Sequence, residues 1–255
     1  MFHRLNRKLK GISMNYKTII KSVILYGGYL FHRNRNSKVI YYHDIGVKYT
    51  NMGTSIELIQ RHINQIRKCG FEIVKSINSR DNQIMICFDD GWSGLYDYKD
   101  FFLKEGIFPT IFVAVDLIGT EYHMTIEQIK ELSSLGFLFQ THSWSHEDLT
   151  TFDSIQLKHE LVDSKAKLEN MLSMRFDAIC FPKGRFSSEV VKESLNAGYK
   201  LLYSSISGAY YDRFNDSIIC RNLVQDLSPR GLKYLIKGRS WFLTYRNIKQ
   251  HFKTY

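Results

Sequence analysis

The sequence predicts an α/β fold, namely a (β/α) barrel of about seven strands. Strand-like apolar runs alternate with helical patterns, and nearly every polar motif follows directly after one of these runs. Such alternation requires a parallel sheet covered by helices, either an open doubly wound sheet or a barrel. Active sites of barrels gather at the C-terminal ends of the strands, so the position of the polar motifs favours the barrel.

The predicted elements follow one another regularly along the chain. The strands are expected at residues 39–43, 84–88, 110–115, 137–141, 178–182, 200–205 and 218–224. The helices between them are expected at residues 55–68, 95–105, 125–135, 154–172 and 187–197. Thr125 and Gly136 fit the two ends of the third helix, and Gly198 fits the end of the last.

Composition divides the chain into three parts. A basic apolar segment (1–37) precedes the predicted barrel domain (38–226), and a basic amphipathic helical segment (227–255) follows it. The 255 residues suffice for one sizeable core, and no internal repeat or long linker indicates a second. The four cysteines have no metal-type spacing and are expected to be small buried hydrophobes, which leaves the redox compartment open.

Charge points to an acidic partner. The formal net charge is +10, and basic residues crowd both ends of the chain. Nucleic acid, an anionic membrane surface and an acidic polymer are the partners that such a charge invites. No nucleic-acid-binding signature accompanies the charge, so we expect no nucleic acid partner. A membrane-facing surface and a merely solvated basic surface remain the two interpretations.

The apolar stretch at 18–31 bears on location. It contains Lys21 and is shorter than the ~20 residues that a membrane-spanning helix needs. It also lacks a clear cleavage site, although a start at Met14 would make it look more like an export signal. An interfacial helix here or at 234–252 is one interpretation, and burial against the barrel is the other. We expect a protein of the cell envelope or associated with a membrane.

Two motifs predict a metal site. Asp89 and Asp90 end a strand-like run, where two adjacent carboxylates resist burial unless something such as a metal ion stabilises them. His142 and His146 follow another strand-like run, and four residues of separation let them face the same way on a helical turn or tight loop. Alone, the two aspartates followed by Gly91 are typical of a turn, and a pair of histidines four residues apart often occurs by chance. Together they indicate a site with two histidines and one carboxylate.

These motifs are similar to those of a known family. The segments Phe88-Asp-Asp-Gly91, His142-Ser-Trp-Ser-His146 and Phe181-Pro-Lys-Gly184 resemble, in this order, the motifs of the NodB-homology polysaccharide deacetylases. The resemblance covers about 39–224 and also implies an incomplete (β/α) barrel. It implies a hydrolase that removes acetyl groups from N-acetylated sugars of a polysaccharide or glycan. A catalytically weak carbohydrate-binding or membrane-associated protein on the same barrel is the alternative.

The resemblance assigns roles to residues of this chain. Asp90, His142 and His146 would hold one divalent metal, Zn²⁺ or alternatively Co²⁺, Ni²⁺ or Mn²⁺. Asp89 would be the general base that deprotonates the attacking water. The backbone N–H near Lys183, which follows Pro182, would stabilise the oxyanion.

Three features depart from the family pattern. Cys180 stands where the family often has the arginine that orients the base, so Arg221 or Arg185 is expected to replace it. The usual Leu-x-His with the catalytic acid is missing, and we expect His43 at the end of the first strand to be the acid. The segment Tyr42-His43-Asp44 resembles the branch that deacetylates exopolysaccharide poly-N-acetylglucosamine.

Two tryptophans flank the motifs. Trp92 follows the aspartates and Trp144 lies between the histidines, and both are candidates for stacking on sugar faces. Burial in the core is the alternative for both.

Overall fold

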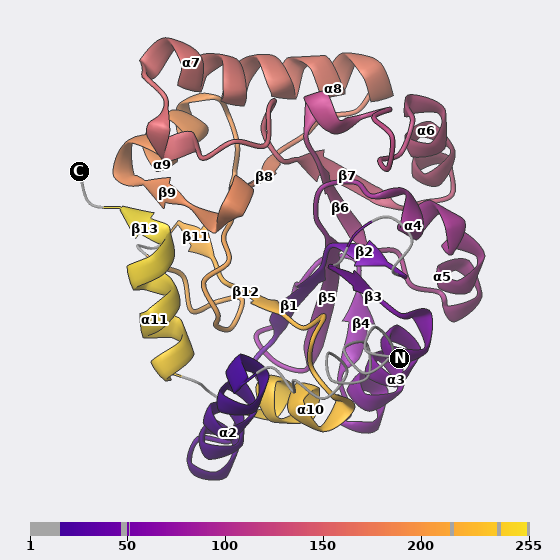
Figure 1. Ribbon diagram of the computed structural model, residues 1–255, viewed down its shortest axis with the longest axis vertical. Coiled ribbons are helices and arrows are strands. Elements are labelled where there is room, and N and C mark those ends of the chain that lie inside the picture. Colours follow the sequence, from indigo (N-terminus) through magenta and orange to yellow (C-terminus); the bar gives the residue numbers. More distant parts are fainter. Residues whose placement is uncertain (1–15, 47–49, 51, 215–216, 239–240, 254–255) are drawn as a thin grey trace, which may run out of the picture.

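The computed structural model of the protein describes residues 16–46, 50, 52–214, 217–238 and 241–253. A parallel sheet lies at its centre and helices surround it (Figure 1). The strands of this sheet are β1 (Lys38–Tyr42), β4 (Glu72–Val74), β5 (Gln83–Phe88), β6 (Thr110–Val113), β7 (Leu138–Thr141), β8 (Ala178–Cys180), β10 (Leu201–Tyr203), β11 (Ile218–Ile219) and β12 (Arg221–Leu223).

The sheet closes into a distorted barrel through one bent strand. The order of its strands is β11-β10-β8-β7-β6-β5-β1-β12, and β4 pairs with the start of β5. Only Cys220 separates β11 from β12, so this stretch of chain pairs with β10 through one half and with β1 through the other. Each predicted strand corresponds to a segment of this barrel, and the prediction of a barrel rather than an open sheet is confirmed.

The helices alternate with these strands as the sequence predicts. They are α2 (Tyr16–Phe31), α3 (Ile56–Lys68), α4 (Ser93–Asp97), α5 (Lys99–Glu105), α6 (Ile126–Ser134), α7 (Ser154–Lys158), α8 (Ser164–Leu172), α9 (Ser188–Asn196), α10 (Pro229–Lys237) and α11 (Trp241–His251). Two short pairs, β2 (Asp44–Ile45) with β3 (Gly53–Thr54) and β9 (Phe186–Ser187) with β13 (Phe252–Lys253), lie outside the barrel.

Local sequence explains most of these boundaries. Residues of β1 and β5 are buried throughout, as expected for strands covered on both faces. Thr125 and Gln128 form a reciprocal capping box at the start of α6, and Gly136 follows its end with a φ of +96°. The helix predicted at 95–105 is instead two helices, because the chain leaves helical geometry at Tyr98. The helix predicted at 154–172 contains a π-helical turn at His159–Asp163.

The C-terminal segment is helical and packs on the barrel. Thr244 of α11 donates a hydrogen bond to the Ser207 carbonyl after β10, at 2.7 Å. Beyond α11, the Phe252 ring packs against Phe186 and Phe214, with centroids 5.5 and 5.2 Å away. These contacts place α11 beside the half of the barrel that contains β8, β10 and β11 (Figure 1). All four cysteines are buried and free.

Candidate active site

Three predicted metal ligands converge at the C-terminal ends of β5 and β7. Asp90 follows β5, and His142 and His146 lie in the loop after β7. The Asp90 Oδ1 atom lies 3.3 Å from His142 Nε2 and 3.0 Å from His146 Nε2. The three side chains offer ligand atoms that all lie within 4.8 Å of one another. The histidines face the same way from a tight loop, not from a helix.

This geometry fits a divalent metal. Tetrahedral bonds of about 2.0–2.1 Å to a zinc ion place two ligand atoms about 3.3 Å apart, close to the separations found here. The Asp90 Oδ1 atom is also fully buried without a hydrogen-bond partner. A buried carboxylate oxygen without a partner costs free energy, and a cation held between it and two imidazoles would remove that cost.

Neighbouring groups fix the orientation of these ligands. The Nδ1 atom of His142 lies 2.6 Å from the Cys180 carbonyl, which only accepts, so Nδ1 carries the proton and the Nε2 lone pair faces Asp90. The indole N–H of Trp92 donates to Asp90 Oδ2 at 3.1 Å, and the Trp92 ring packs on His123 with centroids 4.2 Å apart. Outer contacts of this kind are usual around metal ligands.

The backbone of these loops adopts conformations that favour glycine. Asp90, Ser143, His146 and Lys183 all have φ between +55° and +70°. Residues other than glycine rarely adopt this region, and such strain persists where the surrounding structure enforces it. The strained positions coincide with the three motifs that predicted the site.

Asp89 does not join the Asp90 cluster but pairs with a buried arginine. The Arg221 guanidinium donates to both carboxylate oxygens of Asp89, at 2.7 and 2.8 Å, and its Nε donates to the Ser204 carbonyl at 3.0 Å. Arg221 is only 1% exposed and lies over the Tyr41 ring, 4.2 Å from its centroid. Two parallel hydrogen bonds fix a carboxylate more firmly than a single contact does.

This ion pair keeps Asp89 ionised. Burial alone would raise the pKa of Asp89, but the charge and hydrogen bonds of Arg221 outweigh burial and hold that pKa below its usual value. Each carboxylate oxygen has two lone pairs, so Asp89 can still accept a hydrogen bond from a donor other than Arg221.

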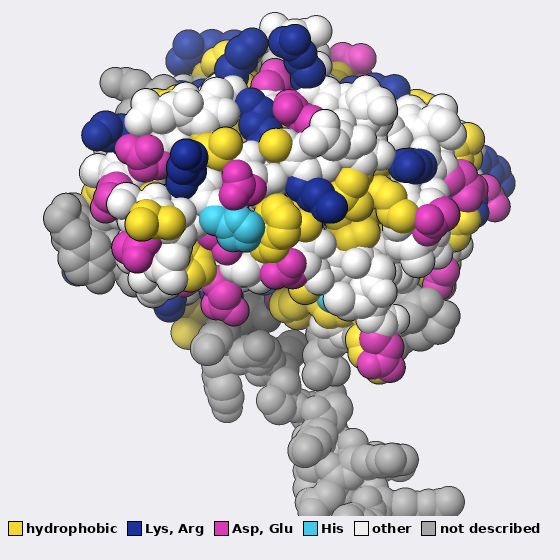
Figure 2. Space-filling model, turned by 90° about the horizontal axis from the view of Figure 1, so that it is seen from above, with side chains coloured by type: hydrophobic (Ala, Val, Ile, Leu, Met, Phe, Trp, Pro, Cys, Tyr) yellow, Lys and Arg dark blue, Asp and Glu magenta, His cyan; other side chains and the backbone are white. Residues whose placement is uncertain are grey.

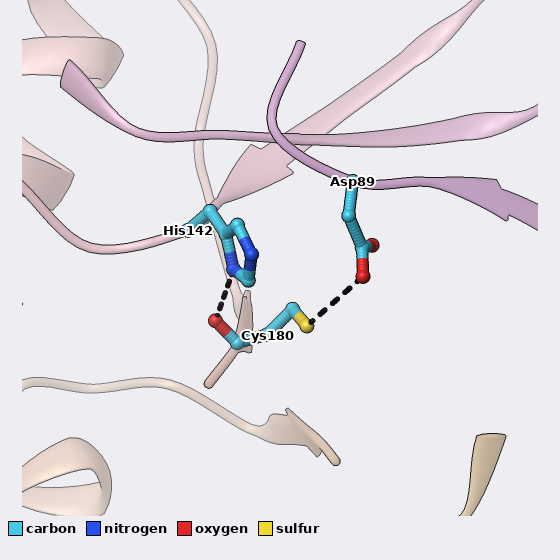
Figure 3. Close-up of side chains that lie close together, drawn as sticks. All are labelled: Asp89, His142 and Cys180. Carbon is cyan, nitrogen blue, oxygen red and sulfur yellow. Dashed lines mark hydrogen bonds between the residues drawn. The ribbon is translucent and has the colours of Figure 1, made fainter. Parts of the chain in front are cut away.

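A second group of metal-ligating side chains shares His142. Figure 3 shows Asp89, His142 and Cys180 pointing toward one another from the ends of β5, β7 and β8. Burial raises the pKa of the Cys180 thiol well above its usual value, which disfavours the thiolate that metals bind. Arg221 already occupies the Asp89 carboxylate. The Asp90 cluster is therefore the better metal site.

Arg221 occupies the space opposite the substituted motif position. Its Nη2 atom lies 2.8 Å from the Cys180 sulfur, so the small side chain at 180 leaves room for a guanidinium that arrives from β12. Arg185, the other candidate, is half-exposed and pairs with Asp148 at 2.8 Å. Of the two replacements that the sequence left open, the structure places Arg221 on Asp89.

The cluster opens into a cavity of about 410 Å³. Its walls come from the barrel and from both terminal helical segments, and the residues include Lys21, Tyr41, His43, Asp89, Asp90, His142, His146, Lys183, Arg246 and His251. A larger cavity of about 580 Å³ lies among α2, α10 and α11 and shares only Ser207 and Leu243 with it. That cavity contains neither Asp90 nor the two histidines, so volume alone would misplace the site.

The end of β1 brings His43 into this cavity. Its Nδ1 atom lies 2.8 Å from Oε1 of Gln225, which follows β12. The expectation that the first and last strands present their ends to one site therefore agrees with the pairing of β1 and β12. Asp44 beside it accepts a hydrogen bond from the Ile45 N–H at 2.8 Å.

His251 is a site residue that the sequence did not predict. It ends α11, is 8% exposed, and its Nδ1 atom has no hydrogen-bond partner. A Cβ atom on Gly184 would lie 3.0 Å from that nitrogen, so His251 lies against the turn that contains Lys183. No motif surrounds it, and only the packing of α11 brings it to the cavity.

The remaining predicted residues have supporting positions. Pro182 is buried and opens the short turn Pro182–Gly184, which places Lys183 at the cavity, and the Lys183 side chain pairs with Glu147. The Trp144 ring packs on His159, with centroids 4.4 Å apart, and the backbone N–H of Trp144 donates to the Glu160 carboxylate at 3.0 Å. Trp92 and Trp144 are not among the residues that line the cavity, and both are half-buried rather than core residues.

A comparison with protein families agrees with these motifs. The family model for polysaccharide deacetylases matches residues 76–202, an interval that contains both aspartates, both histidines and the Pro182 turn. Residues 76–202 therefore form a domain of the polysaccharide deacetylase family. His43, Arg221 and α11 lie outside the matched interval.

Individual proteins show the same similarity. The chain is 32% identical to the Bacillus subtilis protein YxkH over 127 residues, which are 49% of this chain and 46% of that protein. It is 29% identical to the peptidoglycan-N-acetylmuramic acid deacetylase PdaA of Bacillus subtilis over 51% of this chain and 49% of that one. The chain thus spans about half the length of the curated relatives it matches.

Solved structures agree on the fold. The deacetylase PplD of Streptococcus pyogenes, solved in complex with acetate, superposes with a TM-score of 0.70 at 20% identity. The superposition covers 79% of this chain and 98% of that chain. It therefore extends the fold similarity beyond the interval that the family model matches.

Proposed function

We propose that the protein is a metal-dependent hydrolase that removes acetyl groups from N-acetylated sugars of a polysaccharide or glycan. The observation that carries the proposal is one arrangement of side chains. The ligand atoms of Asp90, His142 and His146 converge beside Asp89, and a buried arginine holds Asp89 ionised. Family membership supports this reading, and the cavity beside the cluster offers room for a sugar.

Asp90, His142 and His146 are the residues that would hold the metal, and we propose Zn²⁺, with Co²⁺, Ni²⁺ or Mn²⁺ as alternatives. When bound, the metal supplies Lewis acidity, which lowers the pKa of a water and polarises the acetyl carbonyl. The chain itself supplies the groups that move protons and orient the substrate.

Asp89 takes the role of general base. Its lowered pKa keeps it ionised near neutrality, so that it accepts a proton from the attacking water. The two hydrogen bonds from Arg221 hold the carboxylate in one orientation, which keeps a free lone pair directed at the cavity. Arg221 thus performs from β12 the orienting role that the motif arginine has in the family.

The oxyanion and the leaving amine need a donor each. The backbone N–H of Lys183, which lies at the cavity wall, would donate a hydrogen bond to the developing oxyanion. Lys183 has a φ of +55°, so its backbone does not continue in the direction of the preceding strand. His43 would protonate the departing amine, because a histidine donates protons readily near neutral pH. Gln225 at 2.8 Å from Nδ1 orients the ring, leaving Nε2 as the atom that donates.

The rival interpretation is a carbohydrate-binding protein without turnover on the same barrel. This interpretation rested on the absence of the arginine from the family motif. The ion pair between Arg221 and Asp89 weakens that argument, because Arg221 replaces the missing arginine. The branch that acts on exopolysaccharide poly-N-acetylglucosamine remains our proposal for the substrate, because Tyr42-His43-Asp44 at the barrel mouth resembles that branch.

Acetate release tests the proposed function. The purified full chain, loaded with Zn²⁺, is incubated with N-acetylglucosamine oligomers, and free acetate and free amine are measured. We expect equal amounts of both products, loss of activity on chelation, and recovery when Zn²⁺ is returned. A His142→Ala variant should release neither product. Absence of acetate from the metal-loaded chain across chitin and poly-β-1,6-N-acetylglucosamine oligomers, with sugar binding retained, would favour the rival.

A further inference from the structure

The acidic residues are confined to the middle of the chain. All 25 Asp and Glu residues lie between Asp44 and Asp226, so the chain before and after this interval contains none. Sixteen of the 35 Lys and Arg residues lie in these two terminal parts. The interval from Asp44 to Asp226 therefore has a formal charge of −6, and the net charge of +10 comes entirely from the ends.

The two ends meet in space. Tyr234 of α10 packs against both Tyr26 and Tyr29 of α2, with ring centroids 5.1 and 5.2 Å away. The N–H of Asn34, just after α2, donates to the Lys237 carbonyl at 3.0 Å. Figure 1 shows α2 and α10 crossing at the bottom of the molecule, with α11 beside them. The neighbouring helices α2, α10 and α11, which we call the basic face, thus contain no acidic residue.

An apolar stripe runs along the outer side of α2. Leu25 on the inner side is buried, whereas Ile20, Val23 and Phe31 are 56%, 65% and 81% exposed. Tyr26 and Leu30 on the same side are each 45% exposed. Spacings of three, seven and eleven residues place these side chains on one side of a helix.

The composition of α2 differs from that of a membrane-spanning helix. Among the described residues, no helix combines the length and apolarity that crossing a bilayer requires. A shorter helix with an exposed apolar side and neighbouring cations is suited to lying in the interface of a bilayer. Two cations lie over the Tyr29 ring of α2. They are Arg33, two residues after the end of α2, and Lys233 of α10, which lie 4.8 and 5.6 Å from the ring centroid.

The opposite side of the molecule provides a contrast. Figure 2 looks onto the side that α7 and α8 cover, where acidic and basic side chains are mixed. Ile155 on α7 is 80% exposed, which resembles the exposure of Phe31, but Asp153 caps the start of α7 and Lys158 lies in its last turn. An exposed apolar side chain is therefore not unusual in this chain, and its combination with neighbouring helices that contain cations and no acids is what distinguishes α2.

We propose that the basic face docks the protein on an anionic bilayer, with the outer side of α2 inserted at the level of the lipid headgroups. The partner is a membrane surface because apolar side chains and cations without acids complement acyl chains and anionic headgroups together. A nucleic acid would not favour the apolar stripe. A second copy of the chain would bring like charges together across the contact.

Docking would bring the cavity close to the membrane. Lys21 of α2 and Arg246 of α11 line the cavity beside Asp90 and the histidines, so the docking helices are also walls of the site. The Lys21 ammonium donates to the Leu223 carbonyl of β12 at 2.8 Å, which ties α2 to the barrel. In combination with the proposed function, the substrate would be an acetylated glycan held at a membrane surface.

Vesicle flotation tests the docking. The full chain and two variants are mixed at low salt with vesicles of phosphatidylglycerol and phosphatidylcholine or of phosphatidylcholine alone. Val23→Gln combined with Phe31→Gln removes the apolar stripe, and Ile155→Gln removes a side chain of similar exposure on the opposite side. We expect binding to the anionic vesicles only, weakened roughly tenfold or more by the α2 substitutions and unchanged by Ile155→Gln.

Two further measurements make the result decisive. All three proteins should release acetate from a soluble oligomer at the same rate, since neither α2 residue lines the cavity, and high salt should weaken binding to the vesicles. Docking is overturned by failure of the unaltered chain to bind anionic vesicles, by equal binding to both vesicle types, or by equal effects of the α2 and Ile155 substitutions. It is also overturned if the unaltered chain sediments as an oligomer and the α2 substitutions convert that oligomer to monomers. In that case a second copy of the chain would cover the apolar stripe. None of these outcomes affects acetate release, which tests the proposed function separately.

Discussion

The barrel and the basic face use ionisable side chains in opposite ways. In the barrel, acids and their partners are buried and paired, as Asp89 is with Arg221. On the basic face there are cations and no acids, and apolar side chains remain exposed. Buried pairs fix geometry, which suits proton transfer, whereas exposed unbalanced charge attracts a surface at a distance. In our two proposals, the barrel carries out the chemistry and the basic face attaches the chain to a membrane.

The two regions nevertheless share the cavity. The metal cluster and Asp89 come from barrel strands, while Lys21, Arg246 and His251 come from the helices of the basic face. The comparison therefore predicts that changes in the barrel abolish the chemistry and that changes in the helices only modulate it.

The largest effect is expected from Arg221→Met. This substitution leaves Asp89 buried without its partner, which costs about 3–5 kcal/mol of unfolding free energy and disorders the general base. Turnover should fall to the level of Asp89→Asn. Urea denaturation and acetate release measure the two effects.

Arg185→Met is the matched control for that substitution. Arg185 also forms an ion pair, with Asp148, but it is half-exposed, so its removal should cost no more than about 1 kcal/mol. Equal costs for the two arginines would show that the Asp89 pair is not the organising contact of the site.

The next effect concerns the proton donor. His43→Ala should keep the metal and lower turnover of N-acetyl substrates by about 10²–10⁴, with a smaller loss on an activated acetyl ester whose leaving group needs no proton. His251→Ala in the same cavity should cost less than tenfold, because it supports the Lys183 turn. A reversed order of the two losses would move the acid from the barrel to the C-terminal helix.

The smallest effect is a change in acid stability at the junction of the two regions. His62 of α3 accepts from the Tyr42 hydroxyl through Nδ1 and donates to the Leu227 carbonyl through Nε2, both at 2.8 Å. Burial lowers the pKa of His62 from 6.5 to about 4. Between these pH values the unfolded chain binds a proton that the folded chain does not, so the unfolding free energy falls as the pH decreases through this window.

Replacement of that histidine isolates its contribution. His62→Gln keeps a polar side chain but does not titrate, so its unfolding free energy should decline less between pH 6.5 and 4.5 than that of the unaltered protein. Urea denaturation at pH 7.0, 5.5 and 4.5 measures the difference. Parallel declines would show that another group controls stability in this window.

Much of the fold was predictable because its signals are local. Residues of β1 and β5 form apolar runs, and the capping residues Thr125 and Gly136 mark the ends of α6 within a few positions. The Asp90 ligand cluster was predictable for the same reason, since its ligands lie in the loops that directly follow β5 and β7. The break at Tyr98 and the π-helical turn at His159–Asp163 left no comparable mark in the sequence.

The rest of the site depends on contacts between distant parts of the chain. Asp89 and Arg221 are 132 positions apart, and the sequence alone left Arg185 as an alternative to Arg221. Only closure of the barrel by β12 decides between them. The sequence did not predict His251 as a site residue, because His251 ends a helix far from every motif. The positions of Trp92 and Trp144 were also not predictable, because they depend on contacts with the Asp90 carboxylate and the His159 ring.

The central claim is that two adjacent aspartates perform different tasks, and metal content measured beside acetate release tests it most directly. Both substitutions, Asp89→Asn and Asp90→Asn, keep the side-chain volume nearly unchanged, and both residues follow β5. Each variant is therefore the control for the other. We expect Asp89→Asn to retain one equivalent of Zn²⁺ and to lose about 10²–10⁴ in turnover, whereas Asp90→Asn should lose both the metal and the turnover. Equal metal loss in the two variants, or full turnover in Asp89→Asn, would contradict it.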